Sequence, residues 1–302
     1  MSIGQEKRFA LLIDADNIAS KYIKVIIDEL TNSGVITIKR IYGDWTKSAM
    51  DSWKKILLEY SITPMQQYAY TSGKNSTDSA MIIDAMDILY SNKVDGFCLA
   101  SSDSDFTRLA VRLREAGMEV IGMGEQKTVR PFVTACSQFK YIDLLDKTND
   151  KNEQTLTNNS TSKAKIVKQV ETAKIEDAET EAKDEVSSNA SSGKTEGQCV
   201  VVKPEESGLR SEGESSPTSI DEIKSYLESL IDQKSDNEGW MLLSNVGFML
   251  SKKFPDFDSR NYGHKKLNTL LDSWGFELES IKDPNNKEIP DATINYIRIK
   301  RV

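Results

Sequence analysis

The sequence predicts an α/β fold, a parallel sheet flanked by helices, followed by a small winged helix-turn-helix domain. Over residues 1–148, short runs that are apolar on both faces alternate with helical patterns, which is typical of parallel sheets covered by helices on both sides. Residues 149–215 are polar, hold 9 basic and 14 acidic side chains, and are too poor in apolar residues to form a core. Over residues 216–302, three helical patterns precede two strand patterns. We therefore expect a domain at 1–148, a flexible acidic linker at 149–215 and a second domain at 216–302.

The strand and helix patterns of the first region alternate regularly. Strands are expected at 9–13, 35–42, 65–70, 97–100, 118–123 and 139–144, and those at 9–13 and 97–100 are expected to be buried. Helices are expected at 18–30, 46–60, 79–90 and 106–113, because their apolar residues recur at three- and four-residue spacing. Asp16 or Asn17 is expected to cap the first of these helices.

The last region has a helix expected over Ile220 to Ile231, where Ser219 and Glu222 have the spacing of a capping box. A second helix follows around Val246, and a third is expected over 261–273. The runs 275–278 and 296–299 then predict a two-stranded wing.

Composition excludes several classes of protein. The chain of 302 residues has a net charge of −8, so bulk positive charge cannot hold it on duplex DNA, and any contact with nucleic acid must come from local patches. Three widely spaced cysteines predict neither a disulfide framework nor a zinc site. No apolar run approaches 18 residues, and we expect a cytoplasmic protein without a membrane segment.

Acidic residues follow the strands or begin the helices at several places. Asp14 ends the first strand, Asp78 begins a helix on its apolar stripe, and Asp103 and Asp105 follow the fourth strand. The helix dipole could alone explain Asp78, and Asp84 and Asp87 are assigned to a solvated face of that helix. Because the ends of parallel strands meet at one edge, we expect the four acids to converge there.

Convergence of the acids would require a proton or a cation. Two carboxylates about 5 Å apart repel by roughly 3 kcal/mol at an effective dielectric of about 20. The pattern offers only oxygen ligands and no histidine, which favours Mg²⁺ or Mn²⁺. Such a site is suited to cleavage of phosphodiesters.

The first region resembles the NYN domain, a group of PIN-like nucleases that includes the LabA-like proteins. The likeness covers residues 8–145 and rests on three motifs, LLIDADNI at 11–18, GKNSTDSAMIIDA at 73–85 and LASSDSDFTRLAVRLREAG at 99–117. It implies a PIN-like metal-dependent ribonuclease whose acids are Asp14, Asp78, Asp103 and Asp105, with Asn17 as a supporting polar residue. It also makes Asp84 a recurrent acidic position. Ser102 replaces a glycine of the family's SGDSDF signature.

The last region, 219–301, resembles a LOTUS or OST-HTH domain through GWMLLSNVGFMLSKKFPDFDSRNYG and LNTLLDSWGFELE. That likeness implies binding of single-stranded or structured RNA, or docking of a protein partner. The exposed candidates for such contacts are Lys252, Lys253, Arg260, Tyr262, Lys265 and Lys266. His264, the sole histidine, is expected on a helix surface rather than in catalysis, and a single histidine argues against nucleophilic catalysis by a Ser/His or Cys/His pair.

Several polar, basic and aromatic residues of the first region could contact phosphates or bases near the sheet edge. Taken singly, each basic one is more simply explained as an ordinary surface charge. The candidates are Asn17, Arg40, Trp45, Lys74, Lys127 and Arg130.

The sequence thus predicts a metal-dependent endoribonuclease with a module that binds RNA or protein. One alternative is a non-catalytic RNA-binding or scaffold protein with the same fold. Another is a haloacid-dehalogenase-like phosphatase with Asp14 as a covalent nucleophile, although Asn17 and Ile18 depart from that motif and no partner lysine is evident.

Overall fold

The structure is a computed structural model that describes residues 6–68, 76–147, 217–282 and 293–300. The predicted flexible linker at 149–215 lies outside the described residues, and the boundaries expected for the two domains stay predictions.

The first domain is built on a six-stranded sheet in which every neighbouring pair of strands is parallel. The order is β3-β2-β1-β4-β5-β6. The strands are β1 (Arg8–Asp14), β2 (Val35–Gly43), β3 (Thr63–Gln66), β4 (Gly96–Ala100), β5 (Glu119–Gly124) and β6 (Gln138–Tyr141). After β1 the chain adds β2 and β3 on one side of it. It then adds β4, β5 and β6 on the other side, so the strand order reverses between β1 and β4. Ligands of such sheets bind at that point, beyond the carboxyl ends of the strands.

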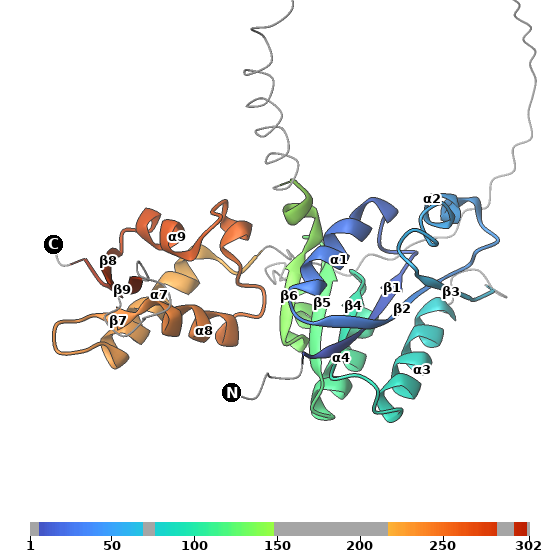
Figure 1. Ribbon diagram of the computed structural model, residues 1–302, viewed down its shortest axis with the longest axis horizontal. Helices are drawn as coiled ribbons and strands as arrows, with labels where there is room; N and C mark the ends of the chain where they lie inside the picture. The colour runs from blue at the N-terminus through green and yellow to red at the C-terminus, as the bar shows by residue number, and fades with distance from the viewer. Residues whose placement is uncertain (1–5, 69–75, 148–216, 283–292, 301–302) are drawn as a thin grey trace, which may run out of the picture. The chain divides into compact units, whose positions relative to one another are not determined.

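Helices cover both faces of the sheet. Figure 1 shows α1 and α2 on one side and α3 and α4 on the other. Their bounds, with the short 3₁₀ turns, are η1 (Ser20–Tyr22), α1 (Ile23–Thr31), η2 (Ser48–Met50), α2 (Asp51–Lys54), α3 (Ser76–Tyr90), η3 (Ser104–Phe106), α4 (Thr107–Glu115) and α5 (Arg130–Ala135). A last helical segment occupies residues 142–147.

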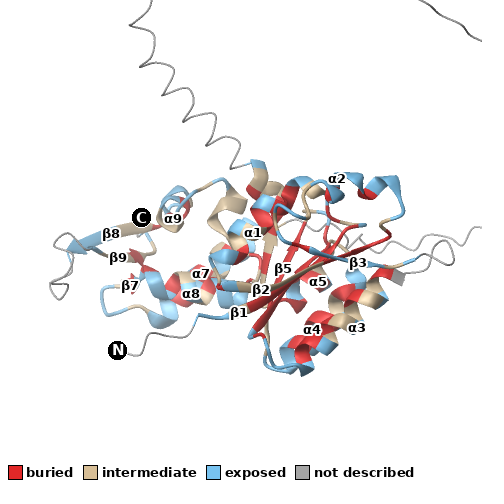
Figure 2. Ribbon diagram, turned by 45° about the vertical axis from the view of Figure 1, so that its right-hand side comes forward, coloured by how far each residue is buried: buried red, intermediate tan, exposed pale blue. Residues whose placement is uncertain are grey.

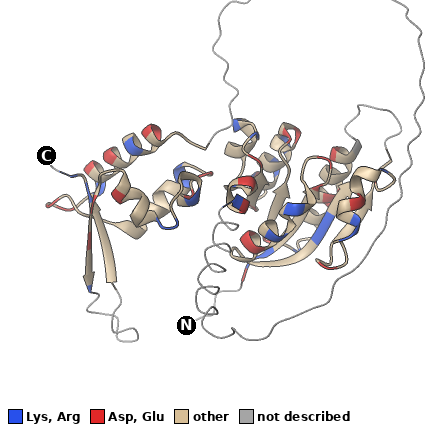
Figure 3. Ribbon diagram, turned by 90° about the horizontal axis from the view of Figure 1, so that it is seen from above, with Lys and Arg blue, Asp and Glu red and all other residues tan. Residues whose placement is uncertain are grey.

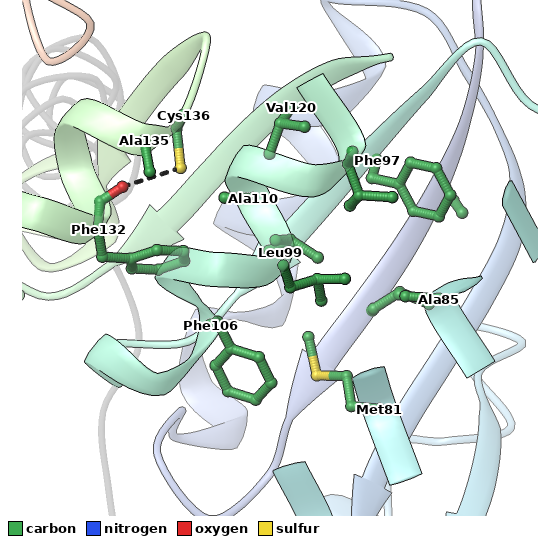
Figure 4. Close-up of a cluster of buried hydrophobic side chains, with 14 of the residues drawn as sticks. Met81, Ala85, Phe97, Leu99, Phe106, Ala110, Val120, Phe132, Ala135 and Cys136 are labelled. Atoms are coloured by element: carbon green, nitrogen blue, oxygen red, sulfur yellow. Dashed lines mark hydrogen bonds between the residues drawn. The ribbon is translucent and has the colours of Figure 1, made fainter. Parts of the chain in front are cut away.

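The central strands are buried on both faces, as their continuous apolar runs predict. In β1, Ala10 and Leu12 pack with the residues of α3, α4 and α5, whereas Leu11 and Ile13 pack with those of α1 and α2. Figure 4 shows the first of these clusters, where Met81 and Phe106 lie close to Leu99. The helices are buried only on the side that faces the sheet (Figure 2). This packing fixes the ends of β1 and β4 and the start of α3.

The C-terminal domain combines helices with a small antiparallel sheet of order β7-β9-β8. Ser219 accepts a hydrogen bond from the Glu222 backbone N–H, which confirms the predicted N-cap of its first helix. Val246, Leu271 and Ile297 join helices and sheet in one core. The elements are α7 (Ile220–Lys234), β7 (Met241–Leu242), α8 (Leu243–Lys253), η4 (Ser259–Tyr262), α9 (Leu267–Ser273), β8 (Glu277–Lys282) and β9 (Thr293–Arg298).

Several predicted boundaries were wrong. Neither Asp16 nor Asn17 caps the first helix, which begins at Ser20 after Ala19. The helix expected at 46–60 is reduced to η2 and α2, and the strand expected at 139–144 ends at Tyr141, where a helical segment begins. The helix expected at 261–273 is divided into η4 and α9.

Candidate metal centre

Asp14 is the buried centre of the candidate site. It ends β1, and its side chain is 0% exposed. One carboxylate oxygen accepts hydrogen bonds from Asn17 Nδ2 and Ser101 Oγ, both at 2.7 Å, and the other accepts from the Asp16 backbone N–H at 3.1 Å. Both oxygens are therefore engaged inside the protein. This disfavours the phosphatase alternative, because a covalent nucleophile must reach its substrate.

Ser101 connects the end of β1 to the loop after β4. It is fully buried and directly follows β4, which pairs with β1. Its hydroxyl donates to Asp14 and accepts the Asp103 backbone N–H at 3.0 Å. The Asp103 carboxylate in turn accepts the Asp105 backbone N–H at 3.0 Å and begins η3. This chain of hydrogen bonds determines where the two acids of the loop lie relative to Asp14.

Three carboxylates meet at the point where the strand order reverses. Asp78, Asp103 and Asp105 each offer one oxygen, and these three oxygens lie within 4.8 Å of one another. Asp78 comes from the first turn of α3, whereas Asp103 and Asp105 come from the loop after β4. Asp78 and Asp103 are half-buried and Asp105 is exposed. Asp14 does not belong to this group of three, although the sequence placed it there.

The group is electrostatically strained. Burial raises the pKa of the Asp78 carboxyl to about 6, and the negative charges of Asp14, Asp103 and Asp105 act in the same direction. Burial likewise raises the pKa of the Asp14 carboxyl, while the hydrogen bonds from Ser101 and Asn17 oppose the change. Acids in such an arrangement are stabilised by a proton or by a cation. Carboxylate oxygens at this spacing are the ligands that Mg²⁺ and Mn²⁺ prefer, so the residues fit such an ion.

Asp84 has a partner within the fold. Its carboxylate accepts hydrogen bonds from Arg40 Nη1 and from the Tyr42 hydroxyl, and only 15% of its side chain is exposed. The prediction that Asp84 lies on a solvated face was therefore wrong, whereas Asp87 is exposed as expected. Arg40, a predicted substrate contact, is therefore bound to Asp84 of α3 within the fold.

The other predicted substrate contacts are spread over several environments. Asn17 supports Asp14 through the hydrogen bond described above, and Lys127 is exposed but forms an ion pair with Glu125 at 2.7 Å. Arg130 donates to Asp256 at 3.0 Å and to Thr218 at 2.8 Å, within the same compact unit of the structure. Trp45 donates its indole N–H to the Met65 carbonyl at 3.0 Å. Lys74 lies outside the described residues.

The sequence pattern missed two polar links. Ser101 was treated as part of a polar run, yet its hydroxyl joins Asp14 to the loop of Asp103. Thr77 donates to the Asp16 carboxylate at 3.1 Å and so connects the start of α3 with the loop after β1. The signal available for both was their position, since Thr77 directly precedes Asp78 and Ser101 directly follows β4, two residues before Asp103.

Among the described residues, no helix is long and apolar enough to cross a membrane.

Comparison with known proteins agrees with the architecture. A family model described as the NYN domain matches residues 8–144, and one described as the OST-HTH/LOTUS domain matches residues 214–290. No curated protein matches the chain. A solved structure, of a protein of unknown function from Vibrio parahaemolyticus RIMD 2210633, is similar at 18% identity and a TM-score of 0.40, covering 47% of this chain and 96% of that one. NYN domains belong to a nuclease superfamily, and OST-HTH/LOTUS domains indicate RNA binding. Residues 8–144 of the chain therefore match the NYN domain and residues 214–290 match the OST-HTH/LOTUS domain.

Proposed function

We propose that this protein is a metal-dependent endoribonuclease that hydrolyses RNA phosphodiesters. The observation that supports it most is the group of three carboxylate oxygens, of Asp78, Asp103 and Asp105, within 4.8 Å of one another at the edge of an NYN domain. The OST-HTH/LOTUS domain in the same chain supports RNA as the substrate.

The three carboxylates would hold the cation. When bound, Mg²⁺ or Mn²⁺ supplies positive charge that stabilises the negative charge developing on the cleaved phosphodiester. Asp105 is the exposed member, so it is suited to orienting a water molecule toward the phosphorus. Asp14 would support the three carboxylates from its buried position. It accepts hydrogen bonds from Ser101 and Asn17 and adds negative charge near Asp78.

The experiment that tests the proposal uses labelled single-stranded and structured RNA with Mg²⁺, Mn²⁺ or EDTA. We expect cleavage by the wild-type protein with either ion and none in EDTA. Asp103→Asn removes one charge from the group and should lower the rate at least 100-fold. Asp87→Asn is the matched control, because Asp87 is an exposed acid of α3 outside the group.

The outcomes separate the proposal from its alternative. Cleavage that persists unchanged in Asp103→Asn would contradict the assigned site. RNA that remains intact with every ion, yet binds equally to both proteins, would favour the non-catalytic RNA-binding or scaffold protein.

A further inference from the structure

A pocket of about 380 Å³ opens beside the loop that follows β1. This volume lies within the range of small-molecule sites, roughly 300–1,000 Å³. Three segments line it, namely the loop after β1, the η2–α2 segment, and the residue that follows β5. The lining residues are Ala15, Asp16, Asn17, Ile18, Ala19, Ser20, Ala49, Met50, Ser52, Trp53 and Glu125.

The buried part of the lining is apolar. Ile18, Met50 and Trp53 are each at most 3% exposed. The indole N–H of Trp53 donates to the Ile18 carbonyl at 3.1 Å, so this hydrogen bond ties α2 to the loop after β1. These side chains form an apolar floor, which favours the apolar face of a planar group over a charged one.

The charged part of the lining is negative, while the hydroxyls of Ser20 and Ser52 can both donate and accept hydrogen bonds. The charged part contains the carboxylates of Asp16 and Glu125, and no lysine or arginine is among the lining residues. Lys127, outside the lining, holds one oxygen of Glu125 at 2.7 Å. Ionised carboxylates only accept hydrogen bonds, so the pocket suits a neutral planar group that donates them rather than a phosphate. Such groups are the nucleobases, which proteins recognise by contacts on their faces and hydrogen bonds on their edges.

The pocket shares a wall with the candidate metal centre. Asp16 and Asn17 line the pocket, and both donate hydrogen bonds to the Asp14 carboxylate. Asp16 also accepts from Thr77, the residue before Asp78. A base in the pocket would therefore bring the adjoining phosphodiester toward the acids.

We propose that this pocket binds the base of one RNA nucleotide beside the cleaved bond, and that it prefers guanine. The Watson–Crick edge of guanine presents N1–H and the N2 amino group side by side, and a carboxylate can accept from both at once. The corresponding edges of adenine, cytosine and uracil each have a single donating group. The role in cleavage rests on the proposed nuclease function, whereas binding of the base does not.

The test measures binding of guanosine, adenosine, cytidine and uridine to the full-length protein in EDTA by titration calorimetry. Nucleosides lack a phosphate, so the acid cluster and any cation do not contribute. We expect guanosine to bind at least tenfold more tightly than the other three. Equal or absent binding of all four would overturn the inference.

Two pairs of variants locate the binding. Ser52→Trp fills the pocket from α2 and should weaken guanosine binding at least tenfold, whereas Ser48→Trp, at an exposed position outside the lining, should not. Glu125→Gln should reduce the preference for guanosine to threefold or less, while Glu115→Gln, at an exposed glutamate of α4 outside the lining, should retain it. Guanosine binding that is unchanged in both Ser52→Trp and Glu125→Gln would place it elsewhere and contradict the proposal.

Mapping the cleavage sites separates the two proposals. We expect wild-type cuts next to guanosine and cuts that spread over other bases in Glu125→Gln. Guanosine binding without any RNA cleavage would support the pocket and contradict the nuclease. Cleavage without base preference and without guanosine binding would support the nuclease and contradict the pocket.

Discussion

Asp78 is the residue at which structure and electrostatics conflict most directly. Burial and the neighbouring acids raise the pKa of its carboxyl from 3.8 to about 6. The folded protein therefore holds this proton more tightly than the unfolded chain does. The resulting stabilisation is complete below about pH 4 and is lost as the pH rises through about 6. At neutral pH the ionised Asp78 destabilises the fold.

Removing the negative charge of Asp78 should stabilise the metal-free protein at neutral pH. Asp78→Asn is expected to raise the free energy of unfolding in EDTA at pH 7.5 by about 1 kcal/mol, because a full cost of roughly 3 kcal/mol is reduced by solvent at a half-buried site. The difference should vanish at pH 3.5. Urea unfolding at the two pH values measures both quantities.

Metal provides a second measurement on the same variant. Saturating Mg²⁺ should stabilise the wild-type protein more than Asp78→Asn, since an ion that binds only the folded state adds its binding free energy. Asp87→Asn should behave as wild type under every condition. An Asp78→Asn protein that is less stable than wild type at pH 7.5 in EDTA would contradict the electrostatic account.

At the residue scale, the sequence predicted the acids but not their hydrogen bonds. Alternation of apolar strands with polar ends indicated that Asp78, Asp103 and Asp105 would meet, because parallel strands bring their ends to one edge. The sequence could not indicate that the Ser101 hydroxyl would hydrogen-bond both to the Asp14 carboxylate and to the Asp103 backbone N–H. Such a contact depends on the distance between β1 and β4, which no local pattern contains. The catalytic role of these acids stays a prediction.

At the scale of elements, a polar cluster fastens α3 to β2. Asp84 on α3 accepts from Arg40 and Tyr42 on β2, and the Tyr42 side chain is 1% exposed. Burial, together with the hydrogen bond to Asp84, raises the pKa of the Tyr42 hydroxyl, so this group stays protonated and remains a donor. Asp84 lies six residues after Asp78 on α3, so this cluster also contributes to the placement of the candidate metal centre.

Removing the charge of Asp84 should weaken this attachment. Asp84→Asn leaves Arg40 without its ionic partner and replaces one acceptor oxygen by a donor. We expect a loss of about 1–3 kcal/mol in the free energy of unfolding, as for other disrupted polar contacts at buried sites. Chemical denaturation at pH 7 measures it. Asp87→Asn on the same helix should stay within about 0.5 kcal/mol of wild type, and an equal loss in both variants would show that the cluster has no special role.

Periodicity predicted the long elements well and the broken ones poorly. The helix expected over 261–273 is interrupted because Gly263 adopts φ +83° and ends the 3₁₀ turn η4. The segment expected as a helix over 46–60 does bury Trp53, and Ile56, Leu57 and Tyr60 pack against the same core, yet α2 ends at Lys54. A repeat of apolar residues indicates which side chains could share a face, but local turns decide whether the backbone continues between them.

At the scale of the whole molecule, charge constrains how RNA can bind. The net charge is −8, and basic and acidic residues are interspersed along the helices and strands (Figure 3). Several basic residues already pair within the fold, as Arg260 does with Asp258 at 2.7 Å. Lys252 and Lys253 are exposed together in the last turn of α8. These two lysines are therefore the clearest candidates for phosphate contacts of the C-terminal domain.

Salt dependence is the measurement that tests these lysines. We expect Lys252→Gln/Lys253→Gln, made in the Asp103→Asn protein so that RNA stays intact, to bind single-stranded RNA more weakly at low salt. The slope of log affinity against log salt should become shallower by roughly 0.7 for each lost phosphate contact, because fewer counterions are released. Thermal stability should not change, since both side chains are exposed. Lys234→Gln, an exposed lysine at the end of α7, is the control and should leave the slope unchanged. An unaltered slope in the double variant would mean that RNA binds another surface, because two phosphate contacts cannot be lost without changing the number of ions released.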